Sequence, residues 1–260
     1  MQSMQGSRAG NPSHIFLRGS TMNGQPIFLT RKESVTLISG PTSTGKRTHF
    51  DDPINYLNRA INKMYSLWLR ATYPFAGCGH NFSAHIPCIL PKPLSRYIHI
   101  GNDVIIRKDV WLNIVQDECE RVKLTIGDRC TIGARSTMSA KNLISIGRNV
   151  ITGTGVLIQD HHHCHDEIDM PIRDQGVTPG GRIRIEEGCW IGNNASIVCN
   201  QGELVIGRNS VIATNALVTR SVPSYSVMVG NPARIARQYD PEKQTWVVGC
   251  VRAEEAPTIA

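Results

Sequence analysis

Four of the nine histidines stand together in one short segment of this 260-residue chain. The segment reads DHHHCHD, from Asp160 to Asp166, and Cys164 separates its third and fourth histidines. Histidine suits proton transfer near neutral pH, because its unperturbed pKa is about 6.5. The same residue types in one tract are also typical of a metal-binding cluster or of plain solvated loop residues. The elements around the segment have to position one of these histidines before it can do chemistry.

Aliphatic or small side chains recur at a step of six residues on both sides of this segment. Such a step fits neither an α-helix, with apolar residues three and four apart, nor a simple alternating strand. It predicts a coil of three short strands, in which each inward side chain stacks on its counterpart one coil later and a glycine lies where the chain bends. Five triplets are in phase: Ile100, Ile106, Leu112; Ile126, Ile132, Met138; Ile146, Thr152, Ile158; Ile185, Ile191, Ile197; and Ile206, Ile212, Val218.

Each interruption of the series falls after the third member of a triplet. If three hexads make one turn of a triangular prism, every insertion therefore lies at the same corner. The longest insertion, residues 159–184, contains the DHHHCHD segment. We expect it to be a loop that projects from one edge of the prism, where functional residues gather on a rigid scaffold.

The rest of the chain divides around the prism, which we assign to residues 76–223. Residues 1–50 have no sustained period and many Gly, Ser, Thr and Asn residues, which predicts a partly disordered or irregular N-terminal arm. Residues 51–75 contain Asp52–Pro53, a helix start signal, and residues 224–260 form a C-terminal extension and polar tail. Apolar residues at helical spacing predict an amphipathic helix over about 53–72 that docks on the first coils: Ile54, Leu57, Ile61, Met64, Trp68 and Ala71.

The composition is 40% hydrophobic and 6% aromatic, with a formal net charge of +7. No run of about 18 apolar residues occurs and the N-terminus is polar, so we expect a cytoplasmic protein without membrane insertion. The eight cysteines include no CxxC pair, which favours reduced thiols over disulfides or structural zinc. The positive charge could serve nucleic acid, anionic lipid or a phosphorylated cofactor.

A second segment imitates a phosphate-binding loop. GPTSTGK, from Gly40 to Lys46, follows the apolar run VTLIS and matches most of the P-loop pattern. Arg47 stands where that pattern needs Ser or Thr for Mg²⁺, and RTHFDDP follows instead of a helix. Nucleotide hydrolysis is therefore not predicted.

Several motifs together resemble the hexapeptide-repeat acyltransferases, in the branch of maltose and galactoside acetyltransferases and polysaccharide O-acetyltransferases. They are the hexads, the WIG of residues 190–192, VTRSVPSYSVMVGNPARIAR at 218–237 and the DHHHCHD loop. The resemblance covers roughly residues 98–240. It implies an all-β fold, a left-handed parallel β-helix, assembled as a homotrimer with acetyl-CoA bound between neighbouring prisms. It implies no metal and no nucleic acid.

The resemblance also implies which residue is the general base. His161 directly follows Asp160 at the root of the loop, where this family has its catalytic histidine, and His163 is the second candidate. We interpret His162 and His165 as solvated. The imidazole could be oriented by a backbone carbonyl or by one of four carboxylates: Asp160, Asp166, Glu167 and Asp169.

Further site residues follow from the same resemblance. Arginine suits bidentate contact with phosphate, although the arginines could equally be a solvated C-terminal face, and family members often have Lys where Arg220 stands. Asp160 and Trp190 are the residues assigned to the acceptor side, Trp190 with packing at a coil edge as the alternative. The residues that would meet the pantetheine, diphosphate or 3′-phosphate of coenzyme A are Asn193, Thr214, Thr219, Arg220, Arg234 and Arg237.

These assignments predict an acetyl-CoA-dependent O-acetyltransferase that acts on a sugar hydroxyl in polysaccharide or glycoconjugate synthesis. Transfer would be direct, with His161 as base and backbone N–H groups of a neighbouring coil stabilising the oxyanion. One alternative is N-acetylation of an amino sugar or a small-molecule drug. The others are a non-catalytic prism and a metalloenzyme like γ-class carbonic anhydrase, with zinc on His161, His163, Cys164 and His165.

Overall fold

The computed structural model describes residues 21–22, 25–26, 53–117 and 121–248, and the chain divides into two units, residues 1–50 and 51–260. In the first unit, β1 (Thr21–Met22) and β2 (Gln25–Pro26) form an antiparallel pair. The remainder of the predicted N-terminal arm, including the GPTSTGK segment, lies outside the described residues, as does the end of the C-terminal tail.

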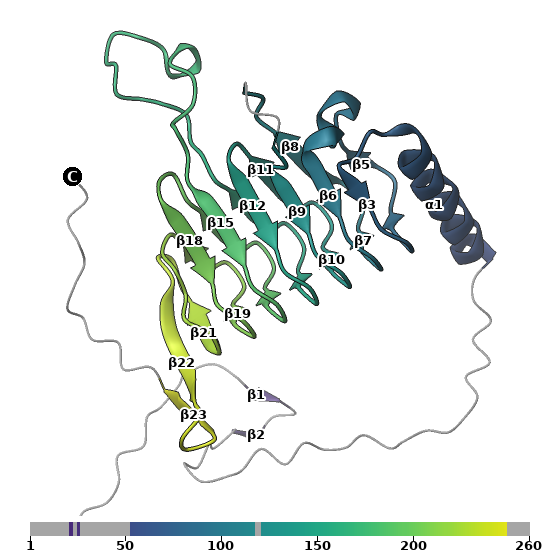
Figure 1. Cartoon of the computed structure of the whole chain (residues 1–260). Helices are drawn as coiled ribbons and strands as arrows, with labels where there is room; N and C mark the ends of the chain where they lie inside the picture. Colours follow the sequence, from purple (N-terminus) through teal and green to yellow (C-terminus); the bar gives the residue numbers. More distant parts are fainter. Residues whose placement is uncertain (1–20, 23–24, 27–52, 118–120, 249–260) are drawn as a thin grey trace, which may run out of the picture. The chain divides into compact units, whose positions relative to one another are not determined.

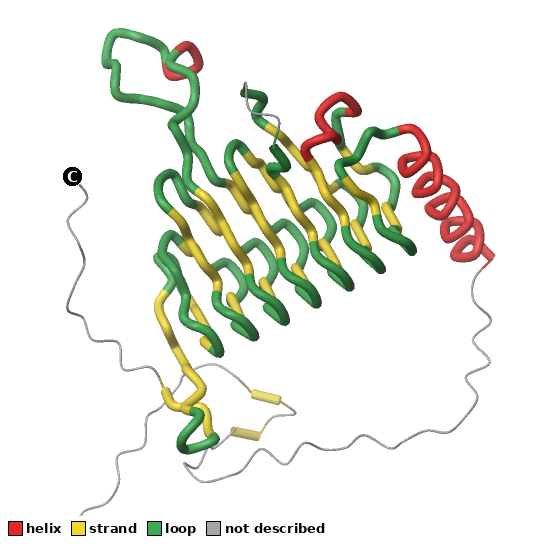
Figure 2. The backbone as a smooth tube through the Cα atoms, in the orientation of Figure 1, coloured by secondary structure: helices red, strands yellow, loops and turns green. Residues whose placement is uncertain are grey.

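The second unit winds into a left-handed parallel β-helix of six coils, which confirms the predicted fold (Figures 1 and 2). Each coil contributes one short strand to each of three sheets. Sheet 1 contains β3 (Gly77–Cys78), β6 (Ile98–Ile100), β9 (Leu124–Ile126), β12 (Leu143–Ile146), β15 (Arg182–Ile185) and β18 (Glu203–Ile206). Sheet 2 contains β4 (Ser83–Ala84), β7 (Ile105–Ile106), β10 (Thr131–Ile132), β13 (Ile151–Thr152), β16 (Trp190–Ile191) and β19 (Val211–Ile212). Sheet 3 contains β5 (Cys88–Ile89), β8 (Val110–Ile114), β11 (Thr137–Ala140), β14 (Leu157–Gln159), β17 (Ser196–Val198) and β20 (Leu217–Val218).

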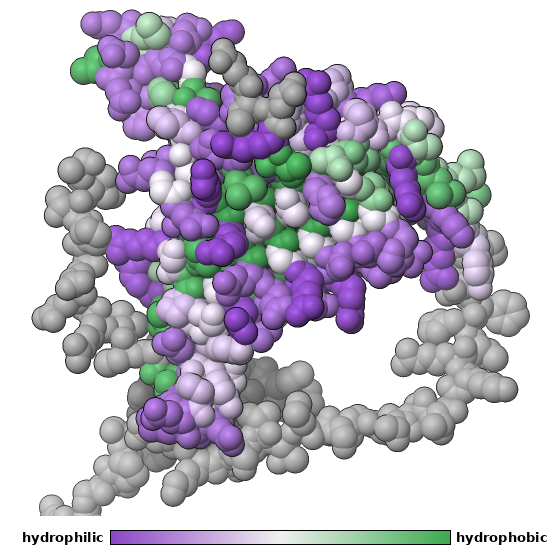
Figure 3. Space-filling model, in the orientation of Figure 1, coloured by the Kyte–Doolittle hydropathy of each residue, from purple (hydrophilic) through white to green (hydrophobic). Residues whose placement is uncertain are grey.

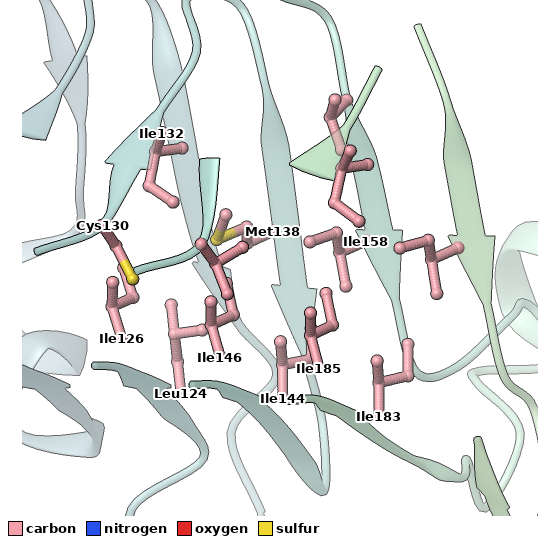
Figure 4. Close-up of a cluster of buried hydrophobic side chains, with 14 of the residues drawn as sticks. Leu124, Ile126, Cys130, Ile132, Met138, Ile144, Ile146, Ile158, Ile183 and Ile185 are labelled. Atoms are coloured by element: carbon pink, nitrogen blue, oxygen red, sulfur yellow. The ribbon is translucent and has the colours of Figure 1, made fainter. Parts of the chain in front are cut away.

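The six-residue step reappears as register between coils. Ile126 pairs with Ile146, and Ile146 pairs with Ile185, so their buried side chains stack in the core (Figure 4). Thr152, the polar member of the series, is buried too, and its hydroxyl accepts a hydrogen bond from Gly133 N at 2.8 Å. One coil precedes the five predicted triplets. Its inward residues, Cys78, Ala84 and Leu90, keep the same step of six, but only Leu90 is a large aliphatic residue.

Two different features make the turns between sheets 1 and 2. Gly127 is needed because a Cβ there would lie 2.7 Å from the carbonyl carbon of Gly147 in the next coil. The left-handed backbone itself falls two residues later, on Arg129, Asn149 and Asn209, with φ of 58°, 58° and 51°. Where a hexad has this glycine, it allows close approach of the coils, while a separate residue makes the bend.

The insertions all lie at the corner between sheets 3 and 1, as the spacing predicts. They include η1 (Lys92–Tyr97), the segment between β8 and β9, and a loop from Asp160 to Gly181 that contains η2 (Ile172–Asp174). This loop leaves the coils as a projection that is largely hydrophilic (Figures 2 and 3). It is shorter than the predicted 159–184, because β15 already begins at Arg182.

The predicted helix is present as α1 (Pro53–Thr72), but it docks through a different face. Most of the apolar stripe that defines its amphipathic pattern is exposed, with Met64 69% and Leu57 60% accessible. Ser66 and Leu69 are buried against the first coil instead. The stripe was therefore wrong as a guide to the docking face.

The edge of the β-helix explains this choice. β4 is the first strand of sheet 2 and has no preceding coil to pair with. Ser66 Oγ accepts a hydrogen bond from Ala84 N at 2.8 Å, and Asn62 Oδ1 accepts one from Ile86 N at 3.2 Å. Polar residues of α1 thus satisfy backbone donors that would otherwise be left at an open edge.

Sheet 2 continues beyond the last coil. β21 (Ser226–Val229) runs parallel to β19, and β22 (Arg234–Asp240) and β23 (Thr245–Val248) follow as antiparallel strands. Part of the predicted C-terminal extension is therefore a regular part of the sheet. Among the described helices, none combines the length and the apolar character that spanning a membrane requires.

Candidate active site

The root of the long loop holds a buried carboxylate next to a buried imidazole. Asp160 follows directly after β14 and is fully buried, and His161 is 6% exposed. The Asp160 carboxylate accepts three backbone hydrogen bonds, from Lys141 N at 2.7 Å, Asn142 N at 2.8 Å and Leu143 N at 2.9 Å. These donors lie where the chain passes from β11 into β12, at the same corner of the prism as Asp160 but one coil earlier, and they hold the carboxylate in position.

The same carboxylate orients the histidine. His161 Nδ1 lies 3.0 Å from Asp160 Oδ1. We assign the proton to Nδ1, since the carboxylate can only accept, and this leaves Nε2 free to take a proton. Of the possible orienting groups that the sequence left open, the structure thus brings Asp160 to the imidazole. Its oxygens are occupied, so Asp160 positions His161 rather than facing the acceptor.

Further hydrogen bonds close the root of the loop. Lys141 Nζ donates to the carbonyl of Thr178, and Asn142 Nδ2 donates to Pro179 O at 2.8 Å. His162 N donates to Thr178 Oγ1 at 3.0 Å, and Thr178 N donates back to His162 O at 2.8 Å. The two arms of the loop are therefore held together where they leave the prism.

The other histidines of the segment are placed differently. His163 is exposed and forms an isolated bridge with Val177, while His165 is exposed with Nδ1 3.3 Å from His163 O. Within the described part of the chain, His163, the second candidate base, has no carboxylate contact comparable to that of His161. Across the described residues, no three or more His, Cys, Asp or Glu side chains are grouped to hold a metal ion.

A polar row beside His161 was missed by the sequence reasoning. Asn113, Ser139 and Gln159 are paired in register on β8, β11 and β14, between inward residues. Asn113 Nδ2 donates to Ser139 Oγ at 2.8 Å. The signal that could have revealed them is a polar residue at the same hexad position in three successive coils, next to the loop root.

Of the predicted coenzyme A residues, Thr219 and Arg220 lie on the same edge of the prism as His161. Gln159 pairs with Val198, and Ile197 pairs with Val218, so the residues after β14 and β20 lie along the same edge of sheet 3. Thr219 and Arg220 are therefore two coils beyond Asp160 and His161. Both are exposed.

The remaining predicted residues lie elsewhere on the prism. Asn193 and Thr214 occupy successive turns between sheets 2 and 3, and Asn193 Oδ1 accepts a hydrogen bond from Thr154 N at 2.9 Å. Arg234 and Arg237 are exposed on β22. Trp190 is 56% exposed on β16 in sheet 2, a different sheet from the one that leads into His161. None of these positions lies at the corner after sheet 3 that carries His161.

The core cysteines are unsuited to act as nucleophiles. Burial raises the pKa of the Cys130 and Cys189 thiols to about 11, so both are protonated at neutral pH. Cys130 Sγ donates to Gly147 O at 3.0 Å, and Cys189 Sγ donates to Gly207 O at 3.2 Å. Both thiols serve packing between coils.

Comparison with known proteins places these coils among hexapeptide repeats. The family model described as the hexapeptide repeat of succinyl-transferase matches residues 123–159 and 182–220, on either side of the long loop. A Mycobacterium tuberculosis protein provisionally named an acetyltransferase is 29% identical over 187 residues, which are 72% of this chain and 56% of that protein. An Escherichia coli protein provisionally named the lipopolysaccharide biosynthesis O-acetyl transferase WbbJ is 28% identical over 109 residues, 40% of this chain and 54% of that protein.

The fold is also found in a solved structure. The N-acyltransferase AntD from Bacillus cereus, a mutant in complex with dTDP and coenzyme A, has a TM-score of 0.54 and 17% identity, covering 68% of this chain and 90% of that chain. At this identity the likeness shows the fold alone. The chain spans about half the length of the two curated relatives. Together the matches confirm the resemblance that the hexads predicted.

Proposed function

We infer that this protein is an acetyltransferase, because it has the repeats and the left-handed β-helix of the hexapeptide-repeat acetyltransferases. We propose that it transfers the acetyl group of acetyl-CoA to a sugar hydroxyl, in polysaccharide or glycoconjugate synthesis in the cytoplasm. The observation that carries the proposal is the buried Asp160–His161 pair, with its carboxylate held by three backbone amides. The names of the curated relatives support the acetyl group, and that of WbbJ supports the hydroxyl acceptor.

His161 is the general base of the proposed reaction. The acceptor oxygen attacks the thioester carbonyl carbon while its proton passes to His161 Nε2. The C–O bond forms, the C–S bond breaks, and the departing thiolate takes the proton from the imidazolium. Asp160 stabilises that imidazolium and holds the ring in one tautomer, so neither residue needs to form a covalent intermediate.

Donor binding is assigned to residues along and beyond the His161 edge. Arg220 follows β20 at the edge of sheet 3, where its guanidinium could contact a phosphate of coenzyme A. Asn193 and Thr214 offer amide and hydroxyl groups to the pantetheine from successive coils. Arg234 and Arg237 add positive charge from β22.

A homotrimer would unite these separated positions. Large apolar side chains remain exposed on the outer faces of the prism: Ile89 and Trp111 are neighbours in sheet 3, and Ile151 and Trp190 are neighbours in sheet 2. Exposed apolar pairs of this kind are typical of subunit interfaces. Light scattering should give a mass near three chains. A monomer mass at micromolar concentration with full activity would contradict the trimer.

The experiment that tests the function is a thiol-release assay with acetyl-CoA and a panel of acceptors. Sugars and nucleotide sugars with free hydroxyls form one arm, and amino sugars and small amines form the other. We expect thiol release with the hydroxyl arm, lost in His161→Ala. Release with amines alone would favour N-acetylation. Activity that a chelator abolishes and that survives His161→Ala would favour the metalloenzyme alternative.

A further inference from the structure

A groove outside the candidate active site separates α1 from the first two coils. It has a volume of about 1180 Å³, enough for a ligand larger than a single ion. One wall is the polar side of α1, and the other is formed by residues around β4 and the turn after β7. The apolar stripe of α1 lies mainly on other sides of the helix.

Positive charge is concentrated in this groove. Lys63 and Arg70 line it from α1, and Arg107 and Lys108 line it from the turn between β7 and β8. No Asp or Glu is among its lining residues. In the part of the chain that the structure describes, these four side chains form no ion pair, whereas Arg148, Arg184 and Lys243 each face a carboxylate. Four uncompensated cations facing one hollow attract an anion strongly.

Part of the remaining lining is suited to hydrogen bonding, and the rest is apolar: Ile61, Leu67, Phe82 and Ile86. Asn55 and Asn58 of α1 and Asn81 of the first coil present amide groups, and Asn81 Nδ2 already donates to Asp103 at 2.9 Å. Asp103 lies near the rim, where His80 Nε2 is 3.8 Å from it. Burial, with Arg107 beside it, lowers the pKa of His85, so His85 offers a neutral ring to a ligand at neutral pH.

We propose that this groove is a binding site for a diphosphate group, carried by a ligand whose hydroxyls reach the asparagines. Cations on both walls can grip the two phosphates from opposite sides, and arginine matches phosphate geometry in two hydrogen bonds. The diphosphate could belong to a soluble nucleotide sugar or to a lipid headgroup. The site does not depend on the proposed acetyl transfer, since none of its residues belongs to the His161 edge.

Calorimetric titration of the full chain with inorganic pyrophosphate, without coenzyme A, tests the site. Coenzyme A is left out because its own diphosphate could enter the groove, and variants of the groove identify the part of the binding that belongs to it. We expect Arg107→Gln/Lys108→Gln to weaken pyrophosphate binding at least tenfold. The charge-matched control Arg182→Gln/Arg208→Gln, with both residues exposed outside the groove, should change it less than twofold.

The opposite wall provides a second variant. Lys63→Gln/Arg70→Gln should weaken binding to a similar extent, and circular dichroism would verify that each variant is folded. Co-sedimentation with phosphatidylcholine vesicles containing a polyprenyl diphosphate separates the two sources, with phosphatidylglycerol vesicles of equal charge as the control for general attraction to anionic lipid. Vesicle binding that both groove variants lose assigns the site to a lipid headgroup, and pyrophosphate binding alone assigns it to a soluble ligand. Equal affinity in groove and control variants for both probes would overturn the proposal.

Discussion

The long loop contains two regions with similar residues and opposite surroundings. At its root, Asp160 and His161 are buried, and the carboxylate is held by three backbone amides of the adjacent corner between β11 and β12. Farther along the loop toward its tip, His163 and His165 are exposed, His163 forms a backbone bridge with Val177, and His165 Nδ1 lies 3.3 Å from His163 O. Imidazoles two residues apart therefore differ in what they can do. In the proposed reaction, His161 rather than His163 acts as the base, because the rigid coils support its imidazole.

The largest expected effect comes from replacing the histidine at the root of the loop. His161→Ala should lower kcat by about 10²- to 10⁴-fold, because the acceptor hydroxyl loses its positioned base. Binding of acetyl-CoA should stay near normal, since the imidazole meets the reacting hydroxyl rather than the donor's phosphates. Steady-state kinetics and calorimetry measure the two quantities.

His163→Ala is the matched control in the tip. It should change kcat less than threefold, a small effect of the size expected for an exposed side chain. If the effects of the two substitutions were reversed, His163 would be the base. The contrast between root and tip would then be wrong as a guide to function.

The second prediction concerns the support of the imidazole. Asp160→Asn places an amide where backbone N–H groups now meet carboxylate oxygens, so one N–H donor and His161 lose an acceptor. Loss of charge-assisted bonds of about 1.5–3 kcal/mol should lower kcat by roughly 10- to 100-fold. Thermal unfolding should show a reduced Tm. Unchanged kcat in a folded Asp160→Asn variant would show that His161 does not depend on this carboxylate.

The fold was much more predictable than the support of the site. The inward side chains of the coils repeat every six residues because each stacks on the next coil. The pattern can therefore be recognised from the residue types alone. The three amides that hold Asp160 belong to Lys141, Asn142 and Leu143, whose side chains say nothing about their backbone N–H groups. The predicted docking face of α1 was wrong for a related reason. The edge strand β4 has backbone N–H groups without a strand partner, and Ser66 accepts a hydrogen bond from one of them, so α1 docks through Ser66 rather than through its apolar stripe.

The third prediction separates the root from the distant cations. The double variant Arg234→Ala/Arg237→Ala should raise KM for acetyl-CoA by about tenfold, the loss expected for one or two charge-assisted hydrogen bonds, and should change kcat less. The variants His161→Ala and Asp160→Asn should instead lower kcat and change KM for acetyl-CoA less. An unchanged KM would mean that these exposed arginines of β22 are surface charge and that the donor is held elsewhere.

The smallest expected effect tests whether the rigidity of the root matters beyond the two buried residues. Lys141→Met removes the ammonium that donates to the Thr178 carbonyl, and with it a hydrogen bond of about 0.5–1.5 kcal/mol. We expect kcat to fall about threefold, and hydrogen exchange to quicken at residues 160–162 and 177–181.

The control is Gln175→Ala in the tip, where Gln175 Nε2 donates to Glu167 O and Met170 O, both at 2.8 Å. This variant should quicken exchange in the tip and leave kcat unchanged. If it lowered kcat as much as Lys141→Met, the tip would take part in the reaction, and the division of the loop into a catalytic root and a solvated tip would have to be abandoned.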